Sequence, residues 1–299
     1  VGTGPYYLEN WDHGDNIAFK RFDGYWGELA RAETLILRWA ADDKQRLLEL
    51  QSGTVDHITD LSPDDYETVQ NDANLIFLPV ANPNVMYLAM VNTSKPFDDV
   101  NIRKAIAMGI DRQRITENFY PVGTEVASHF TPCSIPNACL GEAWYEYDID
   151  AANALLDETG LARDNDGIRF KTTIYYRDVF RRYLPQPGPV AIEIQTQLRD
   201  NLGIDANVVV IDSDEFIYEV SNGFLNGLYL LGWDGHYLHT ADFLDFHFGR
   251  SNPQFGIPYP EIYENLDNAS RITDATVAVE LFTQINNTIK GLVPMIPIV

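Results

Sequence analysis

The sequence has little positive charge. Lysine and arginine together number 21, against 44 aspartate and glutamate residues, so the formal net charge is -23 at pH 7. A surface with this balance repels phosphate backbones and anionic lipid headgroups, so we expect no nucleic acid among the partners. The simplest interpretation of the acidity is a solvated surface that keeps the protein in solution.

Cysteine is also scarce. Only Cys133 and Cys139 occur, in the stretch TPCSIPNACLG. This stretch has neither a CxxC pair nor the Cys/His spacing of a zinc site, so it predicts no metal centre. Two interpretations stay open from these residues alone. Either the two cysteines form a small disulfide loop, which requires an oxidising compartment, or they are two reduced thiols in a loop.

Long apolar runs and catalytic signatures are missing as well. No run approaches the roughly 20 apolar residues that span a bilayer. The nucleophile elbow GxSxG, the phosphate loop of NTPases and the dinucleotide fingerprint GxGxxG do not occur. We therefore expect a protein that does not span a membrane, is not an enzyme and needs no cofactor. The first and last segments, VGTGPYYL and LVPMIPIV, look cut within the fold, so a signal peptide of the precursor would lie outside the sequence.

The sequence does contain a regular alternation of strand-like and helix-like segments between residues 169 and 233. Strand FKTTIYY precedes a helix over Val190–Leu202, strand ANVVVI precedes a helix over Asp214–Val220, and strand GLYLLGW ends the series. Such β-α-β-α-β crossovers build a parallel sheet with helices on both faces, and ligands meet these sheets at the carboxyl ends of the strands. The pattern predicts an α/β fold with Trp233 at such an end.

Further elements are predicted on both sides of this alternation. A helix is expected from Asp99, and further helices are expected after Asp42, Asp111 and Asp150, where an aspartate can cap an apolar-periodic segment. A last amphipathic helix is expected over Ala275–Lys290, followed by a turn at Gly291 and Pro294 and a final strand. Short apolar runs predict strands at Thr34–Ala40, Thr54–Ile58, Leu75–Val80 and Val85–Val91.

The densest group of aromatic and polar residues is GWDGHYLHTADFLDFHF, from Gly232 to Phe248. Trp233 and Tyr237 can stack on a sugar ring or a peptide plane, while Asp234 and His236 fix a polar group. The alternative is that the tryptophan and phenylalanines belong to the core and the histidines cap helices. Imidazole and carboxylate ligands also raise the hypothesis of a divalent metal, but their spacing matches no metal motif, and we predict none at His236, His239, Asp242, Asp245 and His247.

A second candidate site follows strand FKTTIYY. Tyr175, Tyr176 and Arg177 stand at its end, where an arginine can hold a ligand carboxylate through two hydrogen bonds. The alternative is a surface ion pair, because Asp178 is adjacent.

Seven segments carry a family resemblance, in order along the chain: VGTGPYYLENWDHGD, FDGYWG, LLELQSGTVDHI, YLAMVNTSKPFDDVNIRKAIAMGIDRQRI, LRDNLGID, LLGWDGHY and VPMIPI. Together they resemble the family 5 extracellular solute-binding proteins, which include oligopeptide-, dipeptide- and nickel-binding proteins of ABC importers. The resemblance runs over essentially all 299 residues.

The fold implied by this resemblance is a type II periplasmic-binding-protein-like clamshell of two lobes. Residues 1–83 would be the later part of lobe one, residues 84–290 lobe two, and residues 291–299 a return strand toward lobe one. The start of lobe one and its inserted domain would lie outside the sequence. The hinge would lie near Tyr87 to Asn92 and near Pro294, and Tyr87 joins the candidate ligand-binding residues.

The function implied is that of an extracytoplasmic receptor, which captures a peptide or other small polar organic solute and delivers it to the permease of an ABC importer. The resemblance also implies a periplasmic or cell-surface location, a monomer, membrane association only through a lipid anchor or the permease, and a disulfide between Cys133 and Cys139. Peptide-binding members place an acidic residue after the GW pair to hold the ligand's amino group. Here the matching position is His236, with Asp234 nearby. A secreted hydrolase acting on sugars or peptides is the alternative function.

Overall fold

The computed structural model of the chain describes residues 2–40, 42–78, 83–121, 123–250 and 252–299. It divides the chain into two compact units, residues 1–79 and residues 80–299. We call them unit 1 and unit 2 and describe each by itself.

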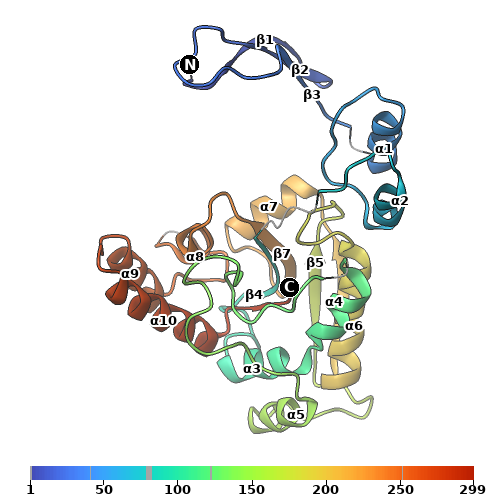
Figure 1. Cartoon of the computed structure of the whole chain (residues 1–299). Coiled ribbons are helices and arrows are strands. Elements are labelled where there is room, and N and C mark those ends of the chain that lie inside the picture. Colours follow the sequence, from blue (N-terminus) through green and yellow to red (C-terminus); the bar gives the residue numbers. More distant parts are fainter. Residues whose placement is uncertain (1, 41, 79–82, 122, 251) are drawn as a thin grey trace. The chain divides into compact units, whose positions relative to one another are not determined.

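Unit 1 begins with a three-stranded antiparallel sheet in the order β1 (Tyr6–Asp12), β2 (Asn16–Arg21), β3 (Thr34–Arg38), as Figure 1 shows. Helix α1 (Asp43–Gln51) follows, and the Asp42 carboxylate accepts a hydrogen bond from the Gln45 amide at 2.8 Å, which confirms the predicted cap. The 3-10 turn η1 (Pro63–Asp65) and helix α2 (Tyr66–Asn71) complete the unit. Among its described residues, the buried hydrophobic side chains are Leu47 and Val69.

Two strands predicted in unit 1 are not formed. Residues 54–58 and 75–78 adopt no strand, and the end of the second segment, residues 79 and 80, lies outside the described residues. Ile76 and Leu78 are 83% and 70% exposed. A strand needs a neighbour to take up its backbone N–H and C=O groups, and within the described ranges no segment pairs with either run.

Unit 2 is built on a five-stranded sheet in the order β6 (Ile204–Val210), β5 (Phe170–Tyr176), β7 (Leu228–Asp234), β4 (Asn84–Met90), β8 (Met295–Pro297). The predicted parallel pairing is confirmed for β6, β5 and β7. By contrast, β4 is antiparallel to β7 and to β8, so the sheet is mixed. Residues 291–299, assigned from the sequence to a return strand, contain the end of the last helix and β8.

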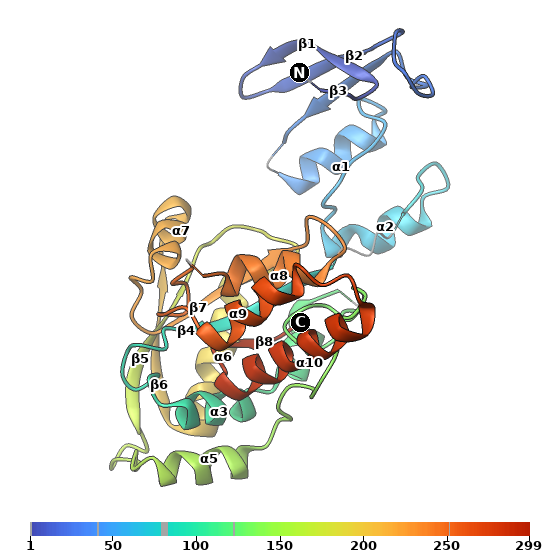
Figure 2. The same ribbon diagram turned by 90° about the vertical axis from the view of Figure 1, so that its left-hand side faces the viewer.

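Helices cover both faces of this sheet (Figures 1 and 2). On one side lie α4 (Arg112–Phe119) and α6 (Pro187–Leu202), with α3 (Val100–Gly109) packed against α6 and α5 (Ile149–Glu158). On the other lie α8 (Thr240–Phe248), α9 (Pro260–Ala269) and α10 (Ala275–Leu292), of which α9 and α10 run side by side. Helix α7 (Ser213–Ser221) joins β6 to β7. Within the described ranges, no helix combines the length and the apolar character that crossing a membrane requires.

The helix ends of unit 2 confirm some of the predicted caps and correct others. Asp99 and Asp111 cap α3 and α4 through their carboxylates. Helix α5 begins earlier than predicted, because Asp148 rather than Asp150 accepts the hydrogen bond of the Ala151 amide. Helix α10 continues through Gly291 to Leu292, and the left-handed residue that ends it is Val293, with φ of 47°.

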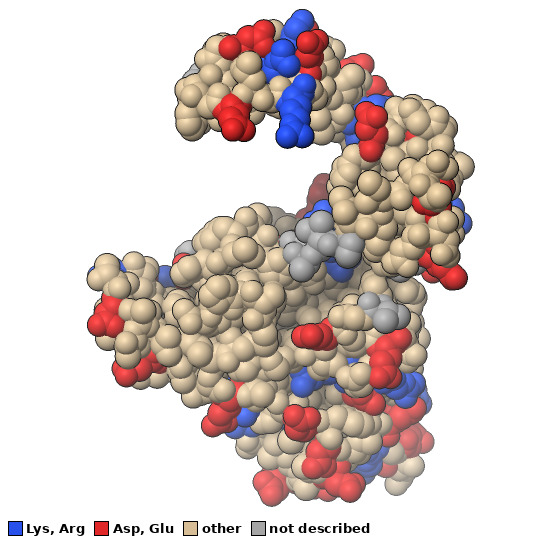
Figure 3. Space-filling view, in the orientation of Figure 1, with Lys and Arg blue, Asp and Glu red and all other residues tan. Residues whose placement is uncertain are grey.

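Charged side chains are spread over the visible face of unit 2 in several separate groups, with Lys and Arg among the carboxylates (Figure 3). This distribution agrees with the interpretation of the acidity as a solvated surface, since no single acidic patch dominates that face.

Candidate ligand-binding site

Unit 2 contains a cavity of about 620 Å³ at the carboxyl ends of β5 and β7. Ligands of α/β proteins bind at this edge of the sheet, because the chain leaves the core there. The walls come from the ends of the two strands, the loop after β5, helix α7, and helix α8 with the loop after it. The lining residues are Tyr87, Arg177, Arg181, Tyr183, Ile217, Val220, Ser221, Leu231, Gly232, Trp233, Asp234, His236, Asp245, Phe246, Gly249, Asn252, Pro253 and Gln254.

Arg177 extends from the end of β5 and is held by two neutral hydroxyl groups. Its guanidinium donates to Ser213 Oγ and to Tyr183 Oη, each at 3.1 Å. The Tyr183 ring lies close to Gly232 of β7, where a Cβ atom would collide with it. A glycine at position 232 therefore lets the tyrosine approach β7 and present its hydroxyl to the arginine.

Arg181 lies in the same loop and also lines the cavity. Its guanidinium donates to the carbonyl oxygen of Phe180 at 2.9 Å. Within the part of the chain that the structure describes, neither Arg177 nor Arg181 forms an ion pair with a carboxylate. Two partly buried guanidinium groups with neutral partners give the cavity a positive wall suited to an anionic group of a ligand.

Trp233, at the end of β7, is half covered by its neighbours. Its ring stacks on Phe246 of α8 with ring centroids 3.9 Å apart, and its indole Nε1 donates to Asp242 Oδ2 at 3.4 Å. Trp233 is therefore more than a core residue, because its ring packs against the core and also lines the cavity.

His236 lines the cavity and is tied to the same carboxylate. Its backbone amide donates to Asp242 Oδ2 at 2.6 Å, and its Nδ1 lies 3.3 Å from Oδ1. The imidazole is 67% exposed, whereas the Asp242 side chain is 6% exposed. The helix-capping role belongs to His239, whose Nδ1 accepts from the Ala241 amide at the start of α8.

Tyr87 forms part of the buried wall of the cavity. Its hydroxyl accepts a hydrogen bond from Gln254 Nε2 at 2.5 Å, and the Tyr229 hydroxyl donates to the Gln254 carbonyl at 2.8 Å. Burial raises the pKa of Tyr87, so this phenol stays neutral.

The structure brings together five of the seven residues predicted to bind ligand: Tyr87, Arg177, Trp233, Asp234 and His236 line one cavity. Tyr176 and Tyr237 are not among its lining residues. The Tyr176 ring packs against the core beside Gly188, and Tyr237 is 55% exposed. The sequence did not single out the contributions of Arg181, Tyr183, Asp245, Phe246 and Gln254. For Arg181 and Tyr183, the sequence did contain a signal, the polar and aromatic run VFRRYLPQP that follows the predicted strand.

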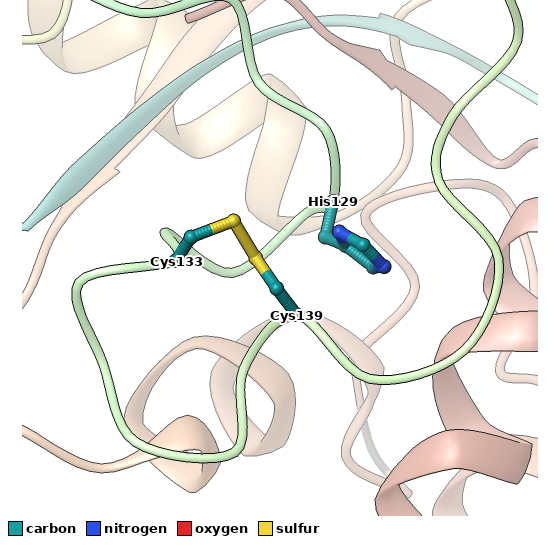
Figure 4. A group of neighbouring side chains, drawn as sticks. All are labelled: His129, Cys133 and Cys139. Carbon is teal, nitrogen blue, oxygen red and sulfur yellow. A yellow bond between two sulfur atoms is a disulfide. The ribbon is translucent and has the colours of Figure 1, made fainter.

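Among the described residues, His236, His239, Asp242, Asp245 and His247 do not bring three possible metal-ligand atoms together. In the described part of the chain, the possible metal-ligand atoms that lie close together belong to His129, Cys133 and Cys139. Figure 4 shows that the two sulfur atoms of this group are joined in a disulfide beside the histidine. Zinc and copper require thiolates from such a set, and a disulfide supplies none.

Comparisons with known proteins extend these observations. Residues 1–255 match the family model described as "Bacterial extracellular solute-binding proteins, family 5 Middle". A dipeptide-binding protein of Escherichia coli is 26% identical over 289 residues, which are 95% of this chain and 53% of that protein. The glutathione-binding protein GsiB of Salmonella paratyphi A is 29% identical over 223 residues, 74% of this chain and 41% of that protein.

A solved structure shares the fold. The dipeptide-binding protein of a Pseudoalteromonas species in complex with Met-Leu superposes with a TM-score of 0.83 at 22% identity, over 99% of this chain and 58% of that one. The predicted α/β fold of the periplasmic-binding-protein type is thereby confirmed. The chain spans about half the length of the curated relatives that it matches.

Proposed function

Because the chain belongs to the bacterial extracellular solute-binding proteins of family 5, we propose that the protein is a receptor that captures a small peptide and delivers it to the permease of an ABC importer. The observation that carries this proposal is the positive wall of the cavity. Arg177 and Arg181 line it without a carboxylate partner among the described residues, and a peptide's terminal carboxylate would supply one.

The relatives support a binding role rather than catalysis, since they are named as dipeptide-, di/tripeptide-, glutathione- and heme-binding proteins. They give no support to a secreted hydrolase. We propose that the receptor works outside the cytoplasmic membrane as a monomer and reaches the membrane through the permease or a lipid anchor. The net charge of -23 argues against nucleic acid as a partner.

We further propose that residues 1–83 belong to lobe one and residues 84–290 to lobe two of a clamshell. The boundary between unit 1 and unit 2, at residues 79 and 80, supports this assignment. The return of residues 291–299 toward lobe one stays a prediction. The cavity is formed entirely by residues of unit 2, so the ligand would meet lobe two at the positive wall.

Calorimetry with trialanine and its C-terminal amide tests the proposed function. We expect trialanine to bind and to be recovered unchanged. The amide should bind about 10-fold or more weakly, because one charge-assisted interaction is lost. Arg177→Gln should weaken trialanine to a similar extent, while the exposed control Arg114→Gln should not. Cleavage of the peptide would favour the hydrolase, and equal affinity for acid and amide would contradict the role of the arginines.

A further inference from the structure

A histidine and two cysteines lie close together in the segment that follows α4, and none of the three lines the cavity. One possible ligand atom from each of His129, Cys133 and Cys139 lies within 4.8 Å of the other two. Ser128 Oγ lies 3.1 Å from His129 Nδ1. The same hydroxyl lies 3.1 Å from Cys133 Sγ and 3.8 Å from Cys139 Sγ. The imidazole is therefore next to both sulfur atoms (Figure 4).

The three side chains differ in their exposure in a way that suits a metal site. His129 is 8% exposed, and burial is the main cause that lowers its pKa. The imidazole is therefore neutral at pH 7, the form that binds a metal ion. Cys133 is exposed and Cys139 is half-buried, so solvent and small reagents can reach the sulfur atoms.

Contacts other than the disulfide hold the loop between the two cysteines in place. Asn286 of α10 donates to the carbonyl oxygens of Ala138 and Leu140, each at 2.9 Å. Thr240 of α8 donates to the carbonyl oxygen of Pro136 at 3.2 Å. These bonds hold the backbone on both sides of the second cysteine, so breaking the bond between the sulfur atoms leaves the cysteines beside the histidine.

Reduction converts the disulfide into metal ligands. A thiolate of a dithiol attacks the exposed Cys133 Sγ, the bond between the sulfur atoms breaks, and its electron pair leaves on Cys139 Sγ. The second thiol of the reductant then displaces Cys133, so the reductant ends as a disulfide and the protein as two thiols. A zinc ion that binds both sulfur atoms releases their protons, and the two thiolates balance its charge.

The distances suit zinc. Zinc binds thiolate sulfur at about 2.3 Å and imidazole nitrogen at about 2.0 Å, so the ligand atoms of a tetrahedral site are about 3.5 to 4 Å apart. Atoms that already lie within 4.8 Å of one another need to move by only about 1 Å, and rotation of the two cysteine side chains, no longer bonded to each other, supplies this movement.

From this arrangement we propose that the reduced loop binds one zinc ion through Cys133, Cys139 and His129, with a fourth position open to water. The oxidised loop does not bind zinc in this way, because the disulfide supplies no thiolate. Zinc and the disulfide are therefore alternative crosslinks of one loop, selected by the redox state of the surroundings. This proposal does not depend on the proposed function, since it uses no residue of the cavity.

The test is a zinc titration of the 299-residue chain before and after reduction with dithiothreitol, which is then removed by gel filtration without oxygen. Competition with a chromophoric chelator measures the affinity. We expect the reduced protein to bind one zinc ion per chain and the unreduced protein to bind zinc about 100-fold or more weakly. Cobalt added to the reduced protein should show thiolate-to-cobalt charge-transfer absorption, which identifies sulfur ligands.

Variants test the histidine. In the reduced protein, His129→Gln should lower the zinc affinity by about 10-fold or more, since loss of a contact in the outer shell of a metal site already costs about that much. The control His57→Gln, which changes an exposed histidine of unit 1, should leave it unchanged. X-ray absorption at the zinc edge needs no variant and should show two sulfur ligands and at least one nitrogen ligand.

Three results would contradict the proposal: equal zinc affinity before and after reduction, a zinc spectrum without sulfur ligands, or undiminished affinity in His129→Gln. Thermal unfolding of each reduced variant without zinc should match that of the reduced unchanged protein, which separates a loss of zinc affinity from a loss of folding. If His129→Gln unfolds, the zinc-edge spectrum of the unchanged protein decides whether nitrogen joins the two sulfur atoms.

Discussion

His247 is a titratable side chain in the core of unit 2, close behind the candidate site. It is 1% exposed and lies edge-on to Trp233 and Tyr87, with ring centroids 5.3 and 5.6 Å apart. Its Nδ1 hydrogen bonds to the Phe243 carbonyl at 2.6 Å, and its Nε2 has no partner among the described residues. Burial lowers the pKa of His247 to about 4, because the core disfavours a charged imidazole.

This burial predicts a loss of stability on mild acidification. The unfolded chain takes up a proton near the ordinary histidine pKa of about 6.5, whereas the folded chain does so only near 4. Above pH 6.5 His247 is neutral in both states, and the free energy of unfolding has its full value. As the pH falls from 6.5 to 4, the unfolded chain takes up the proton first, and the free energy of unfolding decreases by about 3 kcal/mol. Urea unfolding midpoints measured across this range should show the decline.

The control is His247→Asn, which keeps a donor for the Phe243 carbonyl but does not titrate. This variant should be less stable at pH 7.5, because it leaves a gap in the aromatic cluster, yet its stability should fall less steeply between pH 6.5 and 4. The acidic residues of the protein act on both forms alike, so the difference between the two curves isolates His247. Parallel curves would show that His247 takes up its proton equally in both states.

The candidate site shows how far single residues could be predicted. Trp233, Asp234 and His236 were predicted because they directly follow an apolar strand, and they line the cavity. Asp245 was considered only as a metal ligand, because the cavity that it lines is formed by segments that the sequence does not show to be neighbours. That information comes from three-dimensional contacts rather than from spacing in the sequence.

At the scale of elements, Arg103 of α3 links two segments that are far apart in the chain. It is 4% exposed, and its guanidinium donates to the carbonyl oxygens of Leu292 and Val293 at the end of α10 and to that of Phe97. Burial lowers the pKa of Arg103. These bonds satisfy carbonyl groups that the end of a helix leaves open, at the point where Val293 takes a left-handed conformation.

We expect Arg103→Lys to lower the free energy of unfolding by about 2 kcal/mol or more, because an ammonium group cannot reach three carbonyls from one planar fork. The matched change Arg114→Lys affects an arginine whose side chain is 53% exposed and pairs with Glu193, and it should cost less than about 1 kcal/mol. Urea unfolding of both variants measures the difference. Equal losses would contradict the structural role of Arg103.

Elements defined by local signals were predictable, and those defined by partners were not. The helix starts at Asp42, Asp99 and Asp111 follow from side chains that bond to nearby amides, and these were predicted from sequence. The direction of β4 and the absence of strands at residues 54–58 and 75–78 depend on which segments lie alongside, and periodicity carries no such information.

At the scale of the whole molecule, the two units differ in how much apolar surface they bury. Leu47 and Val69 are the buried hydrophobic residues among those described in unit 1, whereas unit 2 has an extended core around β4 and its neighbours. Every residue of β3 is exposed, including Leu35, Ile36 and Leu37. Backbone hydrogen bonds that are not covered by packed side chains open easily, so the two units should differ in local stability.

Hydrogen exchange followed by mass spectrometry on the 299-residue chain measures this difference. After correction for intrinsic rates, we expect amides of β1 to β3 to exchange about 10-fold or more faster than amides of β5 and β7, since a difference of 1.4 kcal/mol in opening free energy suffices. The measurement should be repeated after dilution, because association through the exposed apolar residues of unit 1 would slow its exchange in a concentration-dependent way. Equal protection in both units at every concentration would mean that the sheet of unit 1 is stabilised by something other than burial of its own side chains. Faster exchange in unit 1 alone would place the folding stability of this chain in unit 2, which is also the unit that contains the cavity.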